Sequence, residues 1–395
     1  MTSDGVTIVV INWNRPAETI ECLESLARAD IGGASILVVD NGSRDGSVDT
    51  IRARFPDQRI VALDQNRGFA GGSNAGIRAA LDTGAEGVLL LNNDLVVAPD
   101  FLSYLLGAMS SIPRCAGVSS AIMRMDRPEM LELAYSELRF DRRCVVQLVG
   151  VNALPSEGFD RRCEIEVAVA CSLLLRGEAL REIGLLDEAY FAYHEDVDWC
   201  MRARRAGWVL VFEPYSRVFH RQSSSTSMLR ARPPMENAAP WEPQLPNAEP
   251  MQWNPVRAYL GARNVVRLLR SYATEDERRE FVRRSREELP LEFLAVVLGR
   301  LGKMRLGHWS YRDMMRFYFV ERHAFFRRPP RTAVERAMHW LAFLALVPFD
   351  LLWALPRDVV RALRQGRTAE FTEYVRGLRD GFRDRPLPLE RLRLR

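Results

Sequence analysis

The segment "YHEDVDWCMRARRAGW" concentrates acidic side chains beside a histidine in a way that could serve chemistry. His194, Glu195, Asp196 and Asp198 fall within five positions, and the aromatic run "AYFAY" comes before them. Helix electrostatics is the simpler interpretation, because early acids and late arginines both complement the helix dipole and Gly207 is a normal helix end. A helix start needs only one acid, however, and aromatic residues before a charge cluster suggest a cleft wall that holds a catalytic carboxylate. This segment alone leaves both interpretations open.

Polar residues follow each of four apolar runs in the first half of the chain. We expect strands at 6–11, 35–39, 59–63 and 87–91, helices at 16–28, 47–54, 73–82 and 99–110, and further strands at 167–175 and 208–212. This order predicts a doubly wound α/β domain whose parallel strands are covered on both faces. After the four runs come "NWNR", "DNGSRDGS", "DQNRGFAGGSNAG" and "NNDL". Ligands of open α/β sheets bind outside the carboxyl ends of the strands, so these residues predict a binding cleft.

Two common nucleotide-binding motifs are excluded. A dinucleotide fold would carry G-x-G-x-x-G after the first strand, where this chain has no glycine. A P-loop needs Gly-Lys-Ser/Thr, but the single lysine of the chain, Lys303, is followed by Met304. Any nucleotide must therefore be bound by another kind of loop.

Five motifs together resemble those of the family 2 glycosyltransferases with the GT-A fold, in particular the bacterial rhamnosyltransferase-like branch. They are "VVINWNR", "VVDNGSRDGS", "NRGFAGGSNAG", "LLLNNDLVV" and "HEDVDWCMRARRAGW", in the family's order. The resemblance covers residues 6–225 and continues weakly through "YLGARNVVRLLR" and "YVRGLRDGF". It implies a Rossmann-like, doubly wound mixed sheet in a GT-A catalytic domain, followed by a mainly helical C-terminal region.

The same resemblance implies roles for individual residues. Asp196 would be the catalytic base, and His194 and Glu195 would shape the pocket around it. On the helix-electrostatics interpretation, Asp198 is only a helix-start acid. Asp94 would hold a divalent cation, Mg²⁺ or Mn²⁺, with His220 as a further ligand. An asparagine replaces the first acid of the family's D-x-D motif. The nucleotide-sugar donor would be bound by Asn12, Asn14, Asp40, Asn41, Arg67, Gly68, Asn74, Asn92 and Asn93, with Asp40 hydrogen-bonded to the base.

The implied reaction is the inverting, metal-dependent transfer of a hexose from a nucleotide-diphosphate donor. The acceptor would be a hydroxyl group of a cell-envelope glycan or of a polyprenyl-phosphate-linked glycan. Rhamnose from dTDP-rhamnose is the first expectation, and UDP-hexose, UDP-galactofuranose and GDP-mannose donors stay open. Nucleotidyl transfer on a similar sheet is disfavoured, because its Gly-rich, Lys-containing signature is absent from the sequence.

Charge divides the chain into an acidic and a basic part. Residues 256–395 contain 30 Arg and Lys against 17 Asp and Glu, whereas residues 1–255 contain 25 against 34. The basic part predicts contact with phosphates or an anionic membrane, so we expect a cytoplasmic protein that lies at the inner face of the plasma membrane. The absence of a secretory signal and of C-x-x-C pairs fits that compartment. A nucleic-acid-binding protein is disfavoured, because acids run through the basic part and no nucleic-acid motif occurs.

Composition also predicts three regions. The catalytic domain would span 1–225, a Pro/Ser-rich loop or lid 226–255, and a basic, mainly helical region 256–395. Within the last region we expect helical segments at 255–270, 275–288, 310–327 and 332–355. The apolar run at 340–356 is interrupted by Pro348 and Asp350 and is shorter than the roughly 20 residues that a membrane-spanning helix needs. It favours an interfacial helix or a buried hairpin over a span.

Overall fold

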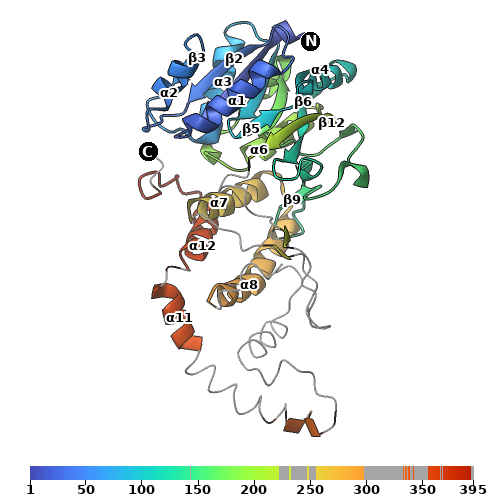
Figure 1. Cartoon of the computed structure of the whole chain (residues 1–395). Coiled ribbons are helices and arrows are strands. Elements are labelled where there is room, and N and C mark those ends of the chain that lie inside the picture. Colours follow the sequence, from blue (N-terminus) through green and yellow to red (C-terminus); the bar gives the residue numbers. More distant parts are fainter. Residues whose placement is uncertain are drawn as a thin grey trace. The chain divides into compact units, whose positions relative to one another are not determined.

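One mixed β-sheet organises the N-terminal part of the chain (Figure 1). The structure, a computed structural model, describes residues 1–142, 144–221, 231–232, 247–248, 255–297, 332, 334–335, 337–338, 341, 355–364, 366 and 368–392. The strands of this sheet are β1 (Val6–Asn12), β2 (Ser35–Asp40), β3 (Arg59–Ala62), β4 (Gly87–Asn92), β5 (Leu95–Val97), β6 (Cys115–Arg124), β7 (Leu131–Leu133), β10 (Cys163–Glu164), β11 (Ser172–Arg176) and β12 (Val209–His220). Their order is β10-β12-β6-β11-β4-β1-β2-β3, with β5 paired to β12 and β7 to β6.

Four parallel strands form the half of the sheet that the apolar runs predicted. Strands β4, β1, β2 and β3 pair in parallel in that order. The chain crosses between them through α1 (Pro16–Arg28), α2 (Ser47–Arg54) and α3 (Gly68–Leu81), and α4 (Phe101–Ser111) follows β5. Ile8 and Val10 of β1 pack in one core with α1 and α4, whereas Val9 faces Gly76 of α3. The sheet is therefore covered on both faces, and the strand order reverses at β1, which lies between β2 and β4.

The other half of the sheet is mixed. Strand β11 runs antiparallel to both β4 and β6, β12 runs parallel to β6, and β5 runs antiparallel to β12. The remaining short elements are η1 (Ser3–Gly5), β8 (Tyr135–Leu138), β9 (Val146–Val149), η2 (Pro155–Glu157), α5 (Gly177–Ile183), η3 (Glu188–Tyr190) and α6 (Glu195–Arg205). The expected doubly wound mixed sheet is confirmed.

Three element boundaries differ from the sequence-based expectation. Helix α3 begins at Gly68 and not near residue 73. Strand β11 begins only at Ser172. In the segment before it, the carbonyl of Val167 accepts a hydrogen bond from the N–H of Ser136, and the N–H of Ala170 donates to Asp196. Strand β12 continues to His220 across a register shift between Glu213 and Arg217. Pro214 lies in that irregular stretch, where a strand tolerates proline.

The chain forms two compact units that interleave along the sequence. The first contains residues 1–223, 260–273 and 380–395, and the second contains 224–259 and 274–379. The described helices after β12 are α7 (Pro255–Tyr272), α8 (Glu275–Val297), α11 (Leu355–Arg364) and α12 (Ala369–Phe382), and two short strands are β13 (Ala231–Arg232) and β14 (Asn247–Ala248). Most of α7 thus belongs with the sheet. The boundaries at residues 225 and 255 remain a prediction.

Helices α7 and α8 occupy the first two helical segments expected in the basic region, and α8 extends to Val297. The expected helix at 310–327 lies outside the described residues. Nearly all of the expected helix at 332–355 and of the 340–356 run also lies outside them. The same holds for most of the 226–255 loop, in which β13 and β14 are described. Of the helices that are described, none combines the length and apolar character needed to cross a bilayer.

Candidate active site

Side chains at the ends of β1 and β2 are tied together around Asp40. Its Oδ2 accepts a hydrogen bond from Asn12 Nδ2 at 2.7 Å, and its Oδ1 accepts one from the backbone N–H of Ser43 at 3.0 Å. Asn14 continues the network, since its backbone N–H donates to Ser43 Oγ and its Oδ1 accepts from the N–H of Arg44. Asp40 is 2% exposed. Each of its oxygens can accept a further bond, so Asp40 is a pre-oriented acceptor.

The same network extends to the end of β4. Thr19, in the first turn of α1, donates to Asn12 Oδ1 at 2.7 Å. Asn93 Nδ2 donates in turn to Thr19 Oγ1 at 2.9 Å. Asn92 and Asn93 are half-buried beside Asp94. The motifs after the first, second and fourth strands therefore meet at one edge of the sheet, as the sequence predicts.

Asn41 and Asn74 hold the backbone of neighbouring loops. Asn41 Nδ2 donates to Gly68 O at 2.9 Å and to Asn66 Oδ1, and its own Oδ1 accepts from the N–H of Arg67 at 3.0 Å. Asn74 makes its bonds elsewhere, to the backbone of Leu186 and to Glu188. The structure thus brings Asn41, Gly68 and the exposed Arg67 next to Asp40, whereas Asn74 is buried away from them.

Asp94 and His220 come together because β5 and β12 pair antiparallel. His220 lies opposite Leu95 in that register, and the N–H of Arg221 donates to Asp94 O at 3.0 Å. The Nε2 atom of His220 is 3.2 Å from Asp94 Oδ2. On the other side of the ring, Nδ1 lies 3.0 Å from each carboxylate oxygen of Glu132 in β7. The histidine is 6% exposed and is clamped between two acids.

These two acids control the charge of His220. Burial alone would lower the pKa of the ring, but the hydrogen bonds and negative charges of Asp94 and Glu132 outweigh it and raise the pKa of His220 to about 10. The ring is therefore protonated near neutral pH in the metal-free protein. A cation that binds at Nε2 must displace that proton.

The Asp94–His220 pair fits a divalent cation. Two ligands that share an octahedral cation, each about 2.1 Å from it, lie about 3 Å apart, close to the observed separation of 3.2 Å. Glu132 occupies the place behind the ring from which a carboxylate commonly orients a metal-binding histidine. Within the described ranges, no group of three or more His, Cys, Asp and Glu side chains forms a metal site. Phosphate oxygens and water would supply the other ligands.

Helix α6 presents the acids of the "HED" segment. His194 is its N-cap, with φ 73°, and is half-buried. Asp196 Oδ2 accepts from the N–H of Ala170 at 3.2 Å, and its Oδ1 accepts from the N–H of Val197 at 2.8 Å. Glu195 is buried, and no group among the described residues donates to its Oε2. Such a position suits a neutral carboxylic acid better than a carboxylate.

The pKa values of the two neighbouring acids agree with that assignment. Burial and then the negative charge of Asp196 raise the pKa of Glu195 well above its usual range. Burial also raises the pKa of Asp196, although the N–H groups of Ala170 and Val197 oppose the increase. Glu195 therefore keeps its proton more readily, and Asp196 is the member of the pair that ionises.

Asp198 is more than a helix-start acid, contrary to expectation. Its carboxylate accepts from Arg202 Nε at 2.9 Å and from the hydroxyl of Tyr272 at 2.7 Å. The side chain is buried, and Arg202 also donates to the carbonyls of Ile183 and Leu185. Asp198 thus joins α6 to α7 and to the segment after α5, and it has a structural role.

Asp94 and Asp196 both lie near the short backbone segment formed by Ala170 and Cys171. The carbonyl of Cys171 accepts from the N–H of Asn92 at 2.8 Å, while the N–H of Ala170 donates to Asp196. Burial, followed by the negative charges of Glu132, Asp94 and Asp196, raises the pKa of the Cys171 thiol. All three carboxylates therefore lie near enough to Cys171 for their charges to act on its thiol, so the fold brings the predicted base into the same region as the predicted metal ligands.

Comparisons with known proteins agree with this geometry. Residues 7–146 match the family model described as glycosyl transferase family 2. Residues 7–146 therefore carry a family 2 glycosyltransferase domain. A relative in Mycobacterium tuberculosis, "N-acetylglucosaminyl-diphospho-decaprenol L-rhamnosyltransferase", is 28% identical over 57% of this chain and 78% of its own. The "dTDP-rhamnosyl transferase RfbF" of Shigella flexneri is 20% identical over 55% of this chain and 69% of its own.

These relatives confirm the resemblance to the rhamnosyltransferase-like branch. In the crystal structure of GalNAc-T7 with UDP, GalNAc and Mn²⁺, the protein is 14% identical and superposes with a TM-score of 0.51 over 83% of this chain and 59% of that one. At this identity the match shows the fold alone, and it confirms the expected GT-A fold. The comparisons give no support to the nucleic-acid-binding alternative.

Sequence reasoning missed several residues of this candidate site. Thr19 and Glu132 were not singled out, and the alternation in "LEL" alone would place the glutamate on the face opposite the two leucines. Asn264 of α7, whose amide group bonds to the loop before α6, was also missed. Each of these residues acts through a contact far along the chain, which local patterns do not show.

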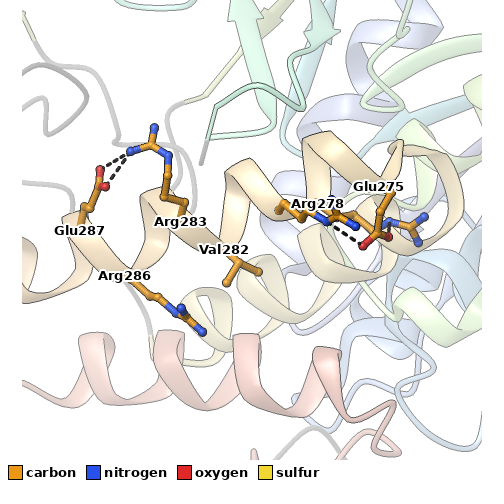
Figure 2. Close-up of a pocket in the computed structure, with 7 residues that line it drawn as sticks. Glu275, Arg278, Val282, Arg283, Arg286 and Glu287 are labelled. Atoms are coloured by element: carbon orange, nitrogen blue, oxygen red, sulfur yellow. Dashed lines mark hydrogen bonds and ion pairs between the residues drawn. The ribbon is translucent and has the colours of Figure 1, made fainter.

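A pocket along α8 does not belong to this site. Figure 2 shows it in the second compact unit, lined by Glu275, Arg278, Arg279, Val282, Arg283, Arg286 and Glu287. Its arginines are paired along the helix, for instance Arg283 with Glu287 at 2.6 Å and Arg279 with Glu275 at 3.3 Å. Much of the positive charge of α8 is therefore neutralised locally.

Proposed function

We propose that this protein is an inverting, metal-dependent glycosyltransferase that moves rhamnose from dTDP-rhamnose to a hydroxyl group of a cell-envelope glycan or polyprenyl-phosphate-linked acceptor. One set of contacts supports the proposal: His220 lies 3.2 Å from Asp94, Asp196 accepts from the N–H of Ala170, and the charges of Asp94 and Asp196 both act on the neighbouring Cys171. The rhamnosyltransferase relatives support the sugar, and the printed name of the mycobacterial relative supports a polyprenyl-linked acceptor.

Asp196 would act as the general base. The acceptor hydroxyl loses its proton to the carboxylate as its oxygen bonds to the anomeric carbon, and the bond from that carbon to the diphosphate oxygen breaks. A positioned base contributes typically 10²–10⁴-fold to such a step. The N–H groups of Ala170 and Val197 occupy two of the four lone pairs of the Asp196 carboxylate, so the carboxylate can still accept the incoming proton. A single displacement of this kind inverts the anomeric centre.

Asp94 and His220 would hold the cation, with Glu132 orienting His220. When bound, the cation would neutralise the charge that develops on the diphosphate as the sugar departs. His220 adds a nitrogen ligand, which favours Mn²⁺ over Mg²⁺ relative to an all-oxygen site. Glu132 fixes the ring so that Nε2 points at Asp94.

Asp40 would bind the nucleotide base. A carboxylate accepts from the ring N–H of thymine, uracil and guanine alike, so Asp40 fits dTDP, UDP and GDP donors. The proposed dTDP-rhamnose therefore depends on the relatives, and UDP-hexose, UDP-galactofuranose and GDP-mannose are the alternatives to compare.

A thermal-shift and hydrolysis screen of these nucleotide sugars with Mn²⁺ tests the proposal. Ligand binding stabilises the folded state by mass action, by about 2.7 kcal/mol at 100 times Kd. We expect dTDP-rhamnose to raise the melting temperature most and to be hydrolysed slowly without acceptor. Another sugar giving the largest shift would change the donor, and no shift with any sugar would contradict the proposed function.

We also propose contact with an anionic membrane surface through α11. This helix carries Arg357, Arg361 and Arg364, and its Val360 and Leu363 are exposed. A basic residue near an anionic leaflet contributes about 1 kcal/mol. The protein should float with anionic vesicles at low salt, less at high salt, and less after joint replacement of Arg361 and Arg364 by glutamate. Failure to float with anionic vesicles at low salt would point to a soluble acceptor.

A further inference from the structure

The loop from Tyr190 to His194, which leads into α6, has a strained backbone. The N–H of Ala192 donates to Tyr190 O at 2.8 Å, which closes a γ-turn around Phe191 at φ 65°. Tyr193 and His194 follow with φ values of 70° and 73°. Three non-glycine residues out of four thus have positive φ. Such conformations persist only where the surroundings hold them in place.

Asn264 of α7 is the residue that holds this loop. Its Nδ2 lies 2.9 Å from Tyr190 O, 2.9 Å from Ala192 O and 2.8 Å from Tyr193 O. The side chain is completely buried. Arg263 supports it, since Nη1 of Arg263 donates to Asn264 Oδ1 at 3.2 Å and also to the carbonyl before the loop, that of residue 189, at 2.9 Å.

The carbonyl of Phe191 joins this loop to the start of α3, which with Arg67 forms the proposed donor-binding loop. Phe191 O accepts from the N–H of Ala70 in α3 at 3.1 Å. Gly68 lies against the same carbonyl, so closely that a Cβ atom there would overlap it. Every carbonyl from residue 189 to residue 193 therefore has a donor. The two N–H groups of Asn264 can serve Ala192 O and Tyr193 O, while Tyr190 O, which Nδ2 also approaches, accepts from the N–H of Ala192.

We propose that Asn264, supported by Arg263, is a positioning residue for catalysis. It fixes the conformation of the Tyr190–His194 loop and thereby the position of Asp196, two residues further on. This inference rests on the proposed role of Asp196 as the base. The helical segment after the sheet then takes part in catalysis without touching the substrate.

The other supports of the site do not depend on Asn264. The body of α6 is anchored by Asp198 to Tyr272 and by Trp199, whose Nε1 donates to Gly184 O at 2.9 Å. The donor-binding loop is held by Asn41. Removing the Asn264 amide should therefore release the first turn of α6 while the helix and the donor pocket stay formed. Turnover should fall, and the KM for the donor should change little.

The experiment compares Asn264→Ala with Arg270→Ala in the full chain. Arg270 lies on the same helix but pairs with Asp384 at 3.2 Å, away from the loop. Asn264→Ser keeps one short donor and serves if the alanine variant does not fold. Hydrogen–deuterium exchange of residues 190–198 is measured first, because it needs no donor. We expect it to be at least tenfold faster in the Asn264 variants and unchanged in Arg270→Ala.

Kinetics with the donor found by the nucleotide-sugar screen are measured next. A misplacement of about 1 Å can cost 10²-fold in rate, so we expect kcat of Asn264→Ala to fall about 10–100-fold, with the donor KM within about threefold of wild type. Unchanged kcat, or equal losses in Arg270→Ala, would overturn the proposal. If wild type transfers no sugar, the proposed function fails, and the exchange measurement still decides whether Asn264 holds the loop.

Discussion

Replacing Asp196 with asparagine is the most direct test of its proposed role as the base. The hydrogen bonds of Asp196 also show how this replacement should affect the stability of the fold. The two oxygens of Asp196 accept backbone N–H groups at 3.2 and 2.8 Å. The asparagine oxygen can keep one of these bonds, but its NH₂ group faces the other N–H, so a bond is lost at a cost of about 1–3 kcal/mol.

A second effect opposes this loss. Burial raises the pKa of Asp196, so the folded state binds a proton more tightly than the unfolded state. The resulting penalty is absent below the unfolded-state pKa, grows as the pH rises above it and is complete above the folded-state pKa. Asparagine carries no charge and relieves the penalty at pH 7. We therefore expect calorimetry at pH 7 to show a melting temperature only a few degrees from wild type.

Turnover should change far more than stability. Asparagine cannot accept the proton of the acceptor hydroxyl, so kcat should fall by roughly 10²–10⁴-fold while nucleotide affinity stays near wild type. The base must be ionised, and because burial raises the pKa of Asp196, the acidic limb of the wild-type pH–kcat profile should lie at higher pH than an unperturbed aspartate would give. Asp196→Asn should lose that limb.

Asp198→Asn is the matched control. Asp198 accepts from Arg202 at 2.9 Å and from Tyr272 at 2.7 Å, so this variant should lose about 1.5–3 kcal/mol of stability from a charge-assisted bond. Its kcat per folded molecule should stay within a few-fold of wild type. The opposite pattern, in which Asp198→Asn abolishes transfer and Asp196→Asn leaves it intact, would refute the assignment of the base.

Three further predictions concern the donor and metal sites. Asp40→Ala should weaken nucleotide affinity by about 1–3 kcal/mol by calorimetry, and an unchanged affinity would remove Asp40 from the site. Chelator should abolish transfer, and added Mn²⁺ or Mg²⁺ should restore it. The Asp94→Asn variant should need far more metal, and His220→Ala should shift the preference between the two metals. Full activity in chelator would contradict a cation at Asp94. Gly68→Ala should lower the melting temperature more than Gly46→Ala. Both glycines have positive φ, but only at Gly68 would a Cβ atom overlap a carbonyl. Equal losses would show that backbone strain alone accounts for the destabilisation.

Local patterns predicted the parallel half of the sheet well, for identifiable reasons. Helix α1 begins at Pro16, a favourable first residue, and its apolar side packs on β1. Helix α3 was predicted too short because its first turns are rich in glycine, which is a poor helix former. Gly76 shows why the helix forms there: a Cβ atom would overlap Val9 of the sheet, so close packing requires glycine.

The residues of the candidate site were predictable only as separate motifs. Asp94, Asp196 and His220 could be named from the sequence, but the approach of His220 to Asp94 depends on a strand pairing made across a long separation. The link from Glu132 to His220 spans 88 residues. No periodicity in either segment indicates such a contact. Asn264 was missed for the same reason, because β12 lies between the Tyr190–His194 loop and helix α7 in the sequence.

The interleaving of the two units affects how the enzyme can fold during synthesis. Residues 380–395 belong to the unit that contains the sheet, and Arg263 Nη2 lies 3.4 Å from the carbonyl of Arg385. The sheet can form early, since its strands are complete by residue 220. Its full set of partners is present only after another 165 residues have left the ribosome. A nascent chain would thus carry the formed strand ends around Asp40 long before it carries the last contacts that hold Arg263 of α7.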